Sequence, residues 1–151
     1  MKIKHPKLRG EWAEMCFMTR AAEHGLSVTR LGGRCRAMTL RWSIKGRFVR
    51  VQVKSTMFLD RGGYTVTVRG WRGKYTGDPF DFVAAYLIPL DIWYILPVAS
   101  FKMRATVGLY PKLKKSKYGR YKEAWHLLRG GAGDTVDRIE ACAEEVLALG
   151  I

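Results

Sequence analysis

The sequence predicts a single domain of the α+β class, built in layers like an α/β sandwich. Three observations support this class: a segment with helical periodicity opens the chain, several alternating segments follow it, and helical segments close it. That order of elements is typical of an α+β fold. The length of 151 residues suits one domain, and a hydrophobic content of 48% is enough to form a core.

The first helix is expected over residues 10–25. Apolar residues recur in it near helical spacing: Trp12, Met15, Cys16 and Ala22. Gly25 follows His24 at the position where a C-terminal cap belongs. After this helix, residues 26–31 are expected to form a short strand or an extended link.

Two alternating segments, 37–43 and 48–54, are expected to pair as a β-hairpin. Apolar and polar residues alternate in both, and a Lys-Gly turn signal lies between them. Residues 64–69 alternate as well and follow a Gly-Gly pair, which predicts a third strand.

The second half of the chain has shorter patterns. Its expected elements are an apolar stretch of undetermined type at 81–87, a buried strand at 92–97, a strand or irregular segment at 104–110, a short helix at 121–128 and a terminal helix at 134–149. Asp81 fits a helix-start residue better than a ligand. We therefore divide the chain into a core domain, 1–133, and an acidic C-terminal helix, 134–151, that packs on the core or on a partner.

The charge of the chain points to a polyanionic partner. There are 27 Lys and Arg against 13 Asp and Glu, a net charge of +14, although the last 18 residues carry five acids and one base. So large a charge repels itself in the folded state, and DNA phosphates are its common counterpart. A merely soluble basic surface, or one that binds an anionic membrane, is the alternative, but no basic amphipathic helix is evident.

Other classes of protein are disfavoured. No apolar run approaches the roughly 20 residues of a membrane helix, and no signal peptide opens the chain, so we expect a cytoplasmic protein with no membrane partner. Cys16, Cys35 and Cys142 are odd in number and far apart, which argues against a disulfide framework or a structural zinc site.

One polar pair stands out in the second strand of the hairpin. Gln52 and Lys54 project to the same side of that strand, and Val51 and Val53 project to the other. Lysine is rarely buried without a partner, and this one could orient a water beside a phosphodiester and stabilise the charge that develops on attack. The alternative is an ordinary exposed sheet face.

Four pieces of the chain, in this order, resemble the PD-(D/E)XK nuclease superfamily. They are Gly-Glu at 10–11, Arg-Val-Gln-Val-Lys-Ser-Thr at 50–56, Asp-Phe-Val-Ala-Ala-Tyr at 81–86 and Trp-Tyr-Ile-Leu-Pro at 93–97. More narrowly, the chain is similar to the small bacterial branch that includes intron-encoded homing endonucleases, in which Gln replaces the acid before X-Lys. The resemblance covers about residues 8–128. It implies a restriction-endonuclease-like core of a helix, a mixed β-sheet built on a hairpin, and flanking helices.

The resemblance also implies a DNA endonuclease with Glu11, Gln52 and Lys54 as catalytic residues. Glu11 and Gln52 would hold Mg²⁺ or Mn²⁺, and Lys54 would assist the attacking water. The family's Asp should fall near Thr39, but no acid occurs between Glu23 and Asp60. Mg²⁺ is usually held by one or two carboxylates, so we expect weak metal affinity, with Glu14 as a further candidate carboxylate.

Several basic residues are candidates for DNA contact: Arg34, Arg36, Arg41, Arg72, Lys74, Lys112, Lys114, Lys115 and Lys117. In the last stretch, Tyr118 and Tyr121 interleave with bases, a pattern that suits base stacking or simply a solvated loop. A homodimer would allow both strands of a duplex to be cut. Two alternative functions stay open: a non-catalytic DNA-binding module on a degenerate nuclease core, and a protein-interaction domain with an acidic partner.

Overall fold

The computed structural model describes residues 1–30, 38–41, 48–68, 80–101 and 104–129. Its main sheet has five strands in the order β1-β2-β3-β6-β7. These strands are β1 (Ser27–Arg30), β2 (Met38–Arg41), β3 (Phe48–Thr56), β6 (Phe82–Leu87) and β7 (Ile92–Pro97). A second sheet has the order β4-β5-β8, from β4 (Leu59–Asp60), β5 (Gly63–Thr67) and β8 (Thr106–Leu109). The α+β class is confirmed.

Helix α1 (Pro6–Glu23) begins four residues earlier than the periodicity predicts. Proline is favoured in the first turn because its missing N–H needs no partner there and its fixed φ suits a helix. The predicted end is confirmed: Gly25 has φ +74°, and the Gly25 and Leu26 N–H groups donate to the carbonyls of Ala22 and Ala21, both at 2.9 Å. This is the Schellman arrangement that closes a helix.

The expected hairpin is confirmed, and the undetermined stretch after it is a strand. β2 and β3 pair antiparallel, with Thr39 opposite Arg50. β6 lies parallel to β3, with Val51 opposite Phe82, and it is buried along its whole length. An uninterrupted apolar run is typical of a parallel strand that is covered on both faces. Asp81 therefore precedes a strand, and its interpretation as a helix-start residue is wrong.

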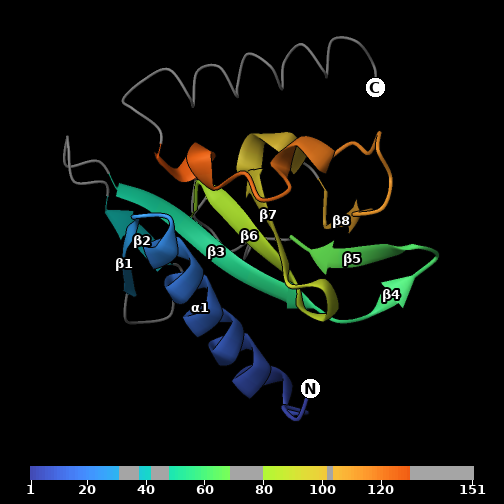
Figure 1. Ribbon diagram of the computed structural model, residues 1–151, viewed down its shortest axis with the longest axis horizontal. Helices are drawn as coiled ribbons and strands as arrows, with labels where there is room; N and C mark the ends of the chain where they lie inside the picture. The colour runs from blue at the N-terminus through green and yellow to red at the C-terminus, as the bar shows by residue number, and fades with distance from the viewer. Residues whose placement is uncertain (31–37, 42–47, 69–79, 102–103, 130–151) are drawn as a thin grey trace.

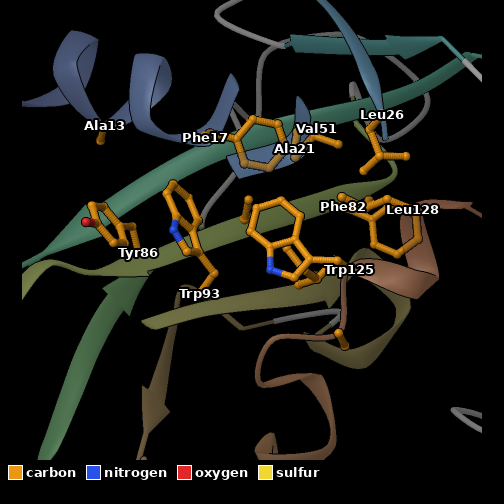
Figure 2. Close-up of a cluster of buried hydrophobic side chains, with 13 residues drawn as sticks. Ala13, Phe17, Ala21, Leu26, Val51, Phe82, Tyr86, Trp93, Trp125 and Leu128 are labelled. Carbon is orange, nitrogen blue, oxygen red and sulfur yellow. The ribbon is translucent and has the colours of Figure 1, made fainter. Parts of the chain in front are cut away.

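The two faces of the main sheet are covered by different layers. On one face, Ala13, Phe17 and Ala21 of α1 pack on Val51 and its neighbours, and Figure 2 shows these side chains converging with Trp93 and Trp125. On the other face, Tyr64 and other residues of the second sheet pack on β6 and β7. Strand β3 is thus central, with α1 crossing one side of it (Figure 1).

The short helix expected at 121–128 is replaced by two 3₁₀ turns, η3 (Gly119–Tyr121) and η4 (Trp125–Arg129). Glu123 separates them with φ +51°. Its N–H donates to the Trp93 carbonyl at 2.7 Å, and its carboxylate accepts the Trp93 N–H at 2.8 Å. Glu123 thus supplies hydrogen-bond partners to both backbone groups of Trp93 on β7. Its left-handed conformation interrupts the chain between the two turns, so a continuous helix is excluded.

Two expectations fall outside the described residues: the Lys-Gly turn of the hairpin at 45–46, and the terminal helix at 134–149. The remaining strands agree with the predicted ones to within a few residues, including β8 in the segment 104–110. None of the helices in the described part of the chain has the length and hydropathy that a bilayer crossing requires.

Candidate active site on the central strand

β3 presents one row of polar side chains. Val51 belongs to the core cluster under α1, so the alternation of the strand turns Arg50, Gln52 and Lys54 toward the opposite face. In the register of β6, Gln52 lies opposite Val83, which belongs to the second core cluster. The three polar side chains therefore share the face on which the second sheet packs.

Within the described residues, the second half of β3 is paired on one edge only. The described part of β2 pairs with β3 only as far as Val51, where Met38 is its partner. From Gln52 to Thr56, the described pairing of β3 is with β6 alone. Gln52 and Lys54 thus lie where the described strands leave one side of β3 open to a ligand.

Gln52 is half-buried and its Oε1 atom is fully buried, yet this oxygen accepts no hydrogen bond within the described residues. An unsatisfied buried acceptor costs about 1–3 kcal/mol. An ordinary exposed sheet face, the alternative interpretation of this residue, does not fit such burial. Within the described part of the chain, the Gln52 oxygen can therefore still take a partner such as a cation or a water. Lys54 is half-buried two residues further along the same face.

Glu11 lies in the N-terminal half of α1. This helix contacts β3, and its N-terminal end lies toward the C-terminal end of that strand (Figure 1). Glu11 is half-buried and makes no hydrogen bond or ion pair within the described part of the chain. The helix α1 covers the face of β3 opposite to Gln52. The described contacts do not join the two residues.

Glu14, the further candidate carboxylate, is paired with an arginine of the sheet. It is buried between α1 and the sheet, and its Oε2 lies 3.3 Å from Nη2 of Arg30 on β1. Thr39, where the resemblance places an Asp, lies on β2 opposite Arg50. Within the described residues, no cluster of three or more His, Cys, Asp or Glu side chains could hold a metal ion.

A contact that sequence reasoning missed lies beside this row. Asp81, just before β6, accepts hydrogen bonds from the Arg50 backbone N–H at 2.8 Å and from its guanidinium at 3.3 Å. The sequence signal was present, since Asp81 opens one of the four resembling segments. Its interpretation required the parallel register of β3 and β6, which no local pattern reveals.

The candidate DNA-binding residues are only partly described. Lys112, Lys114, Lys115 and Lys117 are exposed in the segment that follows β8. Tyr118 is buried, which contradicts the expectation that it stacks on bases. Its burial also raises the pKa of its hydroxyl. Outside the described residues lie Arg34, Arg36, Arg72 and Lys74, and of Arg41 only the backbone is described.

The fold and this site define a nuclease-type core, with a helix over a central strand that carries Gln-X-Lys. The model of the PD-(D/E)XK endonuclease family matches residues 4–128, and the chain belongs to that family. Among solved structures, a bacterial homing endonuclease is similar, with 29% sequence identity, a TM-score of 0.68, and coverage of 94% of this chain and 98% of that one. A search of curated proteins gave no match.

Proposed function

We propose that this protein is a metal-dependent DNA endonuclease that hydrolyses a phosphodiester bond beside the second half of β3. Glu11, Gln52 and Lys54 are the residues that carry this activity. The observation on which the proposal mainly depends is the buried Gln52 Oε1 atom, which lacks a hydrogen-bond partner within the described residues. Membership of the endonuclease family supports the same reaction class.

The donor set fits a weakly held magnesium or manganese ion. The Gln52 amide oxygen and the Glu11 carboxylate are both hard oxygen donors, and Mg²⁺ often retains several waters beside one or two carboxylates. A bound cation would supply positive charge next to the phosphate that is cleaved. Since Glu14 is paired with Arg30 and position 39 is threonine, Glu11 would be the single carboxylate of this set.

The remaining chemistry belongs to Lys54. Its ammonium group can donate hydrogen bonds to a phosphate oxygen or to a nearby water, but it cannot accept one while protonated. It would therefore hold the attacking water in line and stabilise the negative charge that develops on the phosphoryl oxygens. The core packing of Val51 and Val53 fixes the strand beneath it, so the ammonium is held by a rigid element.

A nicking assay on supercoiled plasmid tests this proposal. We expect Mg²⁺- or Mn²⁺-dependent nicking that Lys54→Ala abolishes and that chelation of the metal stops. Arg20→Gln is a suitable control because Arg20 pairs with Asp91 on the α1 side of the sheet, away from the row on β3. Nicking that continues unchanged in Lys54→Ala, with the purified variant folded, would overturn the proposal.

The threonine at position 39 favours a second candidate function, a non-catalytic DNA-binding module on the same core. A site that lacks one carboxylate binds a cation less well, and the surplus of bases remains to bind phosphates. This candidate requires duplex binding in EDTA with a steep dependence on salt, and no nicking in either metal. A homodimer, in which each copy cuts one strand of the DNA duplex, is expected only if the protein is an endonuclease.

A further inference from the structure

We propose that Arg50 binds a backbone phosphate next to the phosphate that is cleaved, and that Asp81 is the positioning residue that orients its guanidinium. This inference rests on the proposed function, because it names a phosphate contact of the same site. Its ligand is a DNA phosphate diester.

The acceptor in this pair is held rigidly. The Asp81 N–H donates to the Arg50 carbonyl at 2.8 Å, and the Asp81 carbonyl accepts the Val98 N–H at 3.0 Å. The Asp81 carboxylate in turn accepts the Arg50 N–H at 2.8 Å. Two backbone hydrogen bonds and one between the Arg50 N–H and the carboxylate thus fix Asp81 against the start of β3, so its carboxylate can hold a guanidinium in one orientation.

The guanidinium uses only one of its edges on Asp81. Nε lies 3.5 Å from Oδ2, and Nη2 lies 3.3 Å from Oδ1. A guanidinium has five N–H donors in a planar fork, and within the described residues the Nη1 group of Arg50 has no partner. The free edge has the geometry that binds phosphate oxygens in pairs.

The exposure of the pair argues against a mainly structural role. The Arg50 side chain is 47% exposed and the Asp81 side chain 40%. Ion pairs this exposed contribute little to stability, because water screens the charges and two side chains lose freedom. The main physical effect of the contact is therefore orientation of a cationic group that stays accessible to solvent.

The place of Arg50 on the strand matches the spacing of a DNA backbone. Arg50, Gln52 and Lys54 share one face, and alternate residues of a strand are about 6.6 Å apart. That distance is comparable to the step between consecutive phosphates of one DNA strand. With the cleaved phosphate beside Gln52 and Lys54, Arg50 lies within reach of its neighbour.

The test is duplex binding measured by fluorescence anisotropy in EDTA, with a labelled random-sequence duplex and a series of salt concentrations. Loss of one phosphate contact lowers the slope of log affinity against log salt by about one. We expect this decrease for Arg50→Gln. Arg20→Gln is the matched control because it also removes the arginine of an Arg–Asp pair, and we expect its slope to equal that of the wild type.

The role of Asp81 is tested by a double-mutant cycle of Arg50→Lys and Asp81→Asn. Lysine keeps the charge without the fork, so Arg50→Lys should keep the salt slope and weaken binding. The same substitution should weaken binding less in the Asp81→Asn background, where orientation is already lost. Equal losses in both backgrounds would mean that Asp81 does not orient the guanidinium, and this result would overturn the assignment of Asp81.

The outcomes separate this inference from the proposed function. A wild-type protein that binds duplex while Arg50→Gln keeps the full salt slope overturns the phosphate contact and leaves the endonuclease proposal intact. A wild-type protein that fails to bind duplex at low salt overturns both. If Arg50→Gln does not fold, as judged by thermal unfolding, the binding loss of Arg50→Lys with and without Asp81→Asn decides whether Arg50 contacts a phosphate.

Discussion

The Tyr86 hydroxyl donates a hydrogen bond of 2.8 Å to Oδ1 of Asp91, across the turn that joins β6 to β7. The second oxygen of Asp91 accepts a 2.7 Å hydrogen bond from Arg20 of α1. The Asp91 carboxylate therefore links α1 to the hairpin that β6 and β7 form. The rings of Tyr86 and Trp93 stack beside this contact with centroids 4.2 Å apart. The hydrogen bond from Tyr86 therefore also fixes a ring of the aromatic core under α1.

Asp91→Asn should weaken the protein at neutral pH but not in acid. The hydrogen bond from Tyr86, and then that from Arg20, lowers the pKa of Asp91 from its ordinary value of 3.8. A depressed folded pKa stabilises the protein above the unfolded pKa, and the effect is lost as the pH falls through the folded value. Burial, followed by the bond to Asp91, raises the pKa of the Tyr86 hydroxyl, so it stays protonated as a donor.

Urea denaturation of both proteins at pH 7 and below pH 3 checks this expectation. The Asp91 side chain is more than half exposed, so the difference at pH 7 should be under about 1 kcal/mol. Asparagine is the right replacement because it keeps the size of the side chain and tolerates the φ of +50° at Asp91. An equal difference at both pH values would contradict the role given to the ionised carboxylate.

Glu123→Ala should destabilise the protein by about 2 kcal/mol, because charged hydrogen bonds contribute about 1.5–3 kcal/mol. The carboxylate accepts the Trp93 N–H at 2.8 Å and the Trp125 Nε1–H at 2.7 Å, and both donors lie in partly buried positions. Thermal unfolding and tryptophan fluorescence would report the change. Glu123→Gln keeps an acceptor and should cost less; an equal cost would indicate that charge, not hydrogen bonding, is what Glu123 supplies.

Glu11 and Glu14 are a matched pair for testing the helix acid. Glu11→Gln should abolish or weaken Mn²⁺ binding in calorimetry and leave the unfolding temperature nearly unchanged. Glu14→Gln should do the reverse, because Glu14 is buried against Arg30: we expect a loss of about 1–2 kcal/mol, less than for a fully buried pair since Arg30 is mostly exposed. Metal binding that disappears with Glu14 alone would transfer the role to that residue.

Thr39→Asp should strengthen the proposed site. Position 39 lies opposite Arg50 on the strand next to Gln52, so a carboxylate there adds a hard oxygen ligand to a set that has one. We expect tighter Mg²⁺ binding in calorimetry and faster nicking than in the wild type. Thr39→Asn is the control for shape without charge. Unchanged metal affinity in Thr39→Asp would mean that β2 does not face the ion.

Most of the fold could be predicted from local patterns. Alternation along 48–54 identified the central strand and the side from which Gln52 and Lys54 project, because a strand has a two-residue period wherever it is placed. The end of α1 was predicted by Gly25, since a left-handed cap favours glycine locally. The order of the resembling segments indicated the family, which the match over residues 4–128 confirms.

The tertiary structure decided what depends on partners distant in the chain. The 81–87 stretch is a strand because β3 and β7 supply its hydrogen bonds on both sides. A helix at 121–128 is lost because Glu123 bonds to the edge of β7 instead. Glu11 and Glu14 are equivalent acids in the sequence, and only packing pairs one with Arg30. The sequence by itself indicated most of the elements and the candidate residues, because alternation, helical spacing and turn residues are local; the pairing of strands and the neighbours of each charge came from contacts between distant segments.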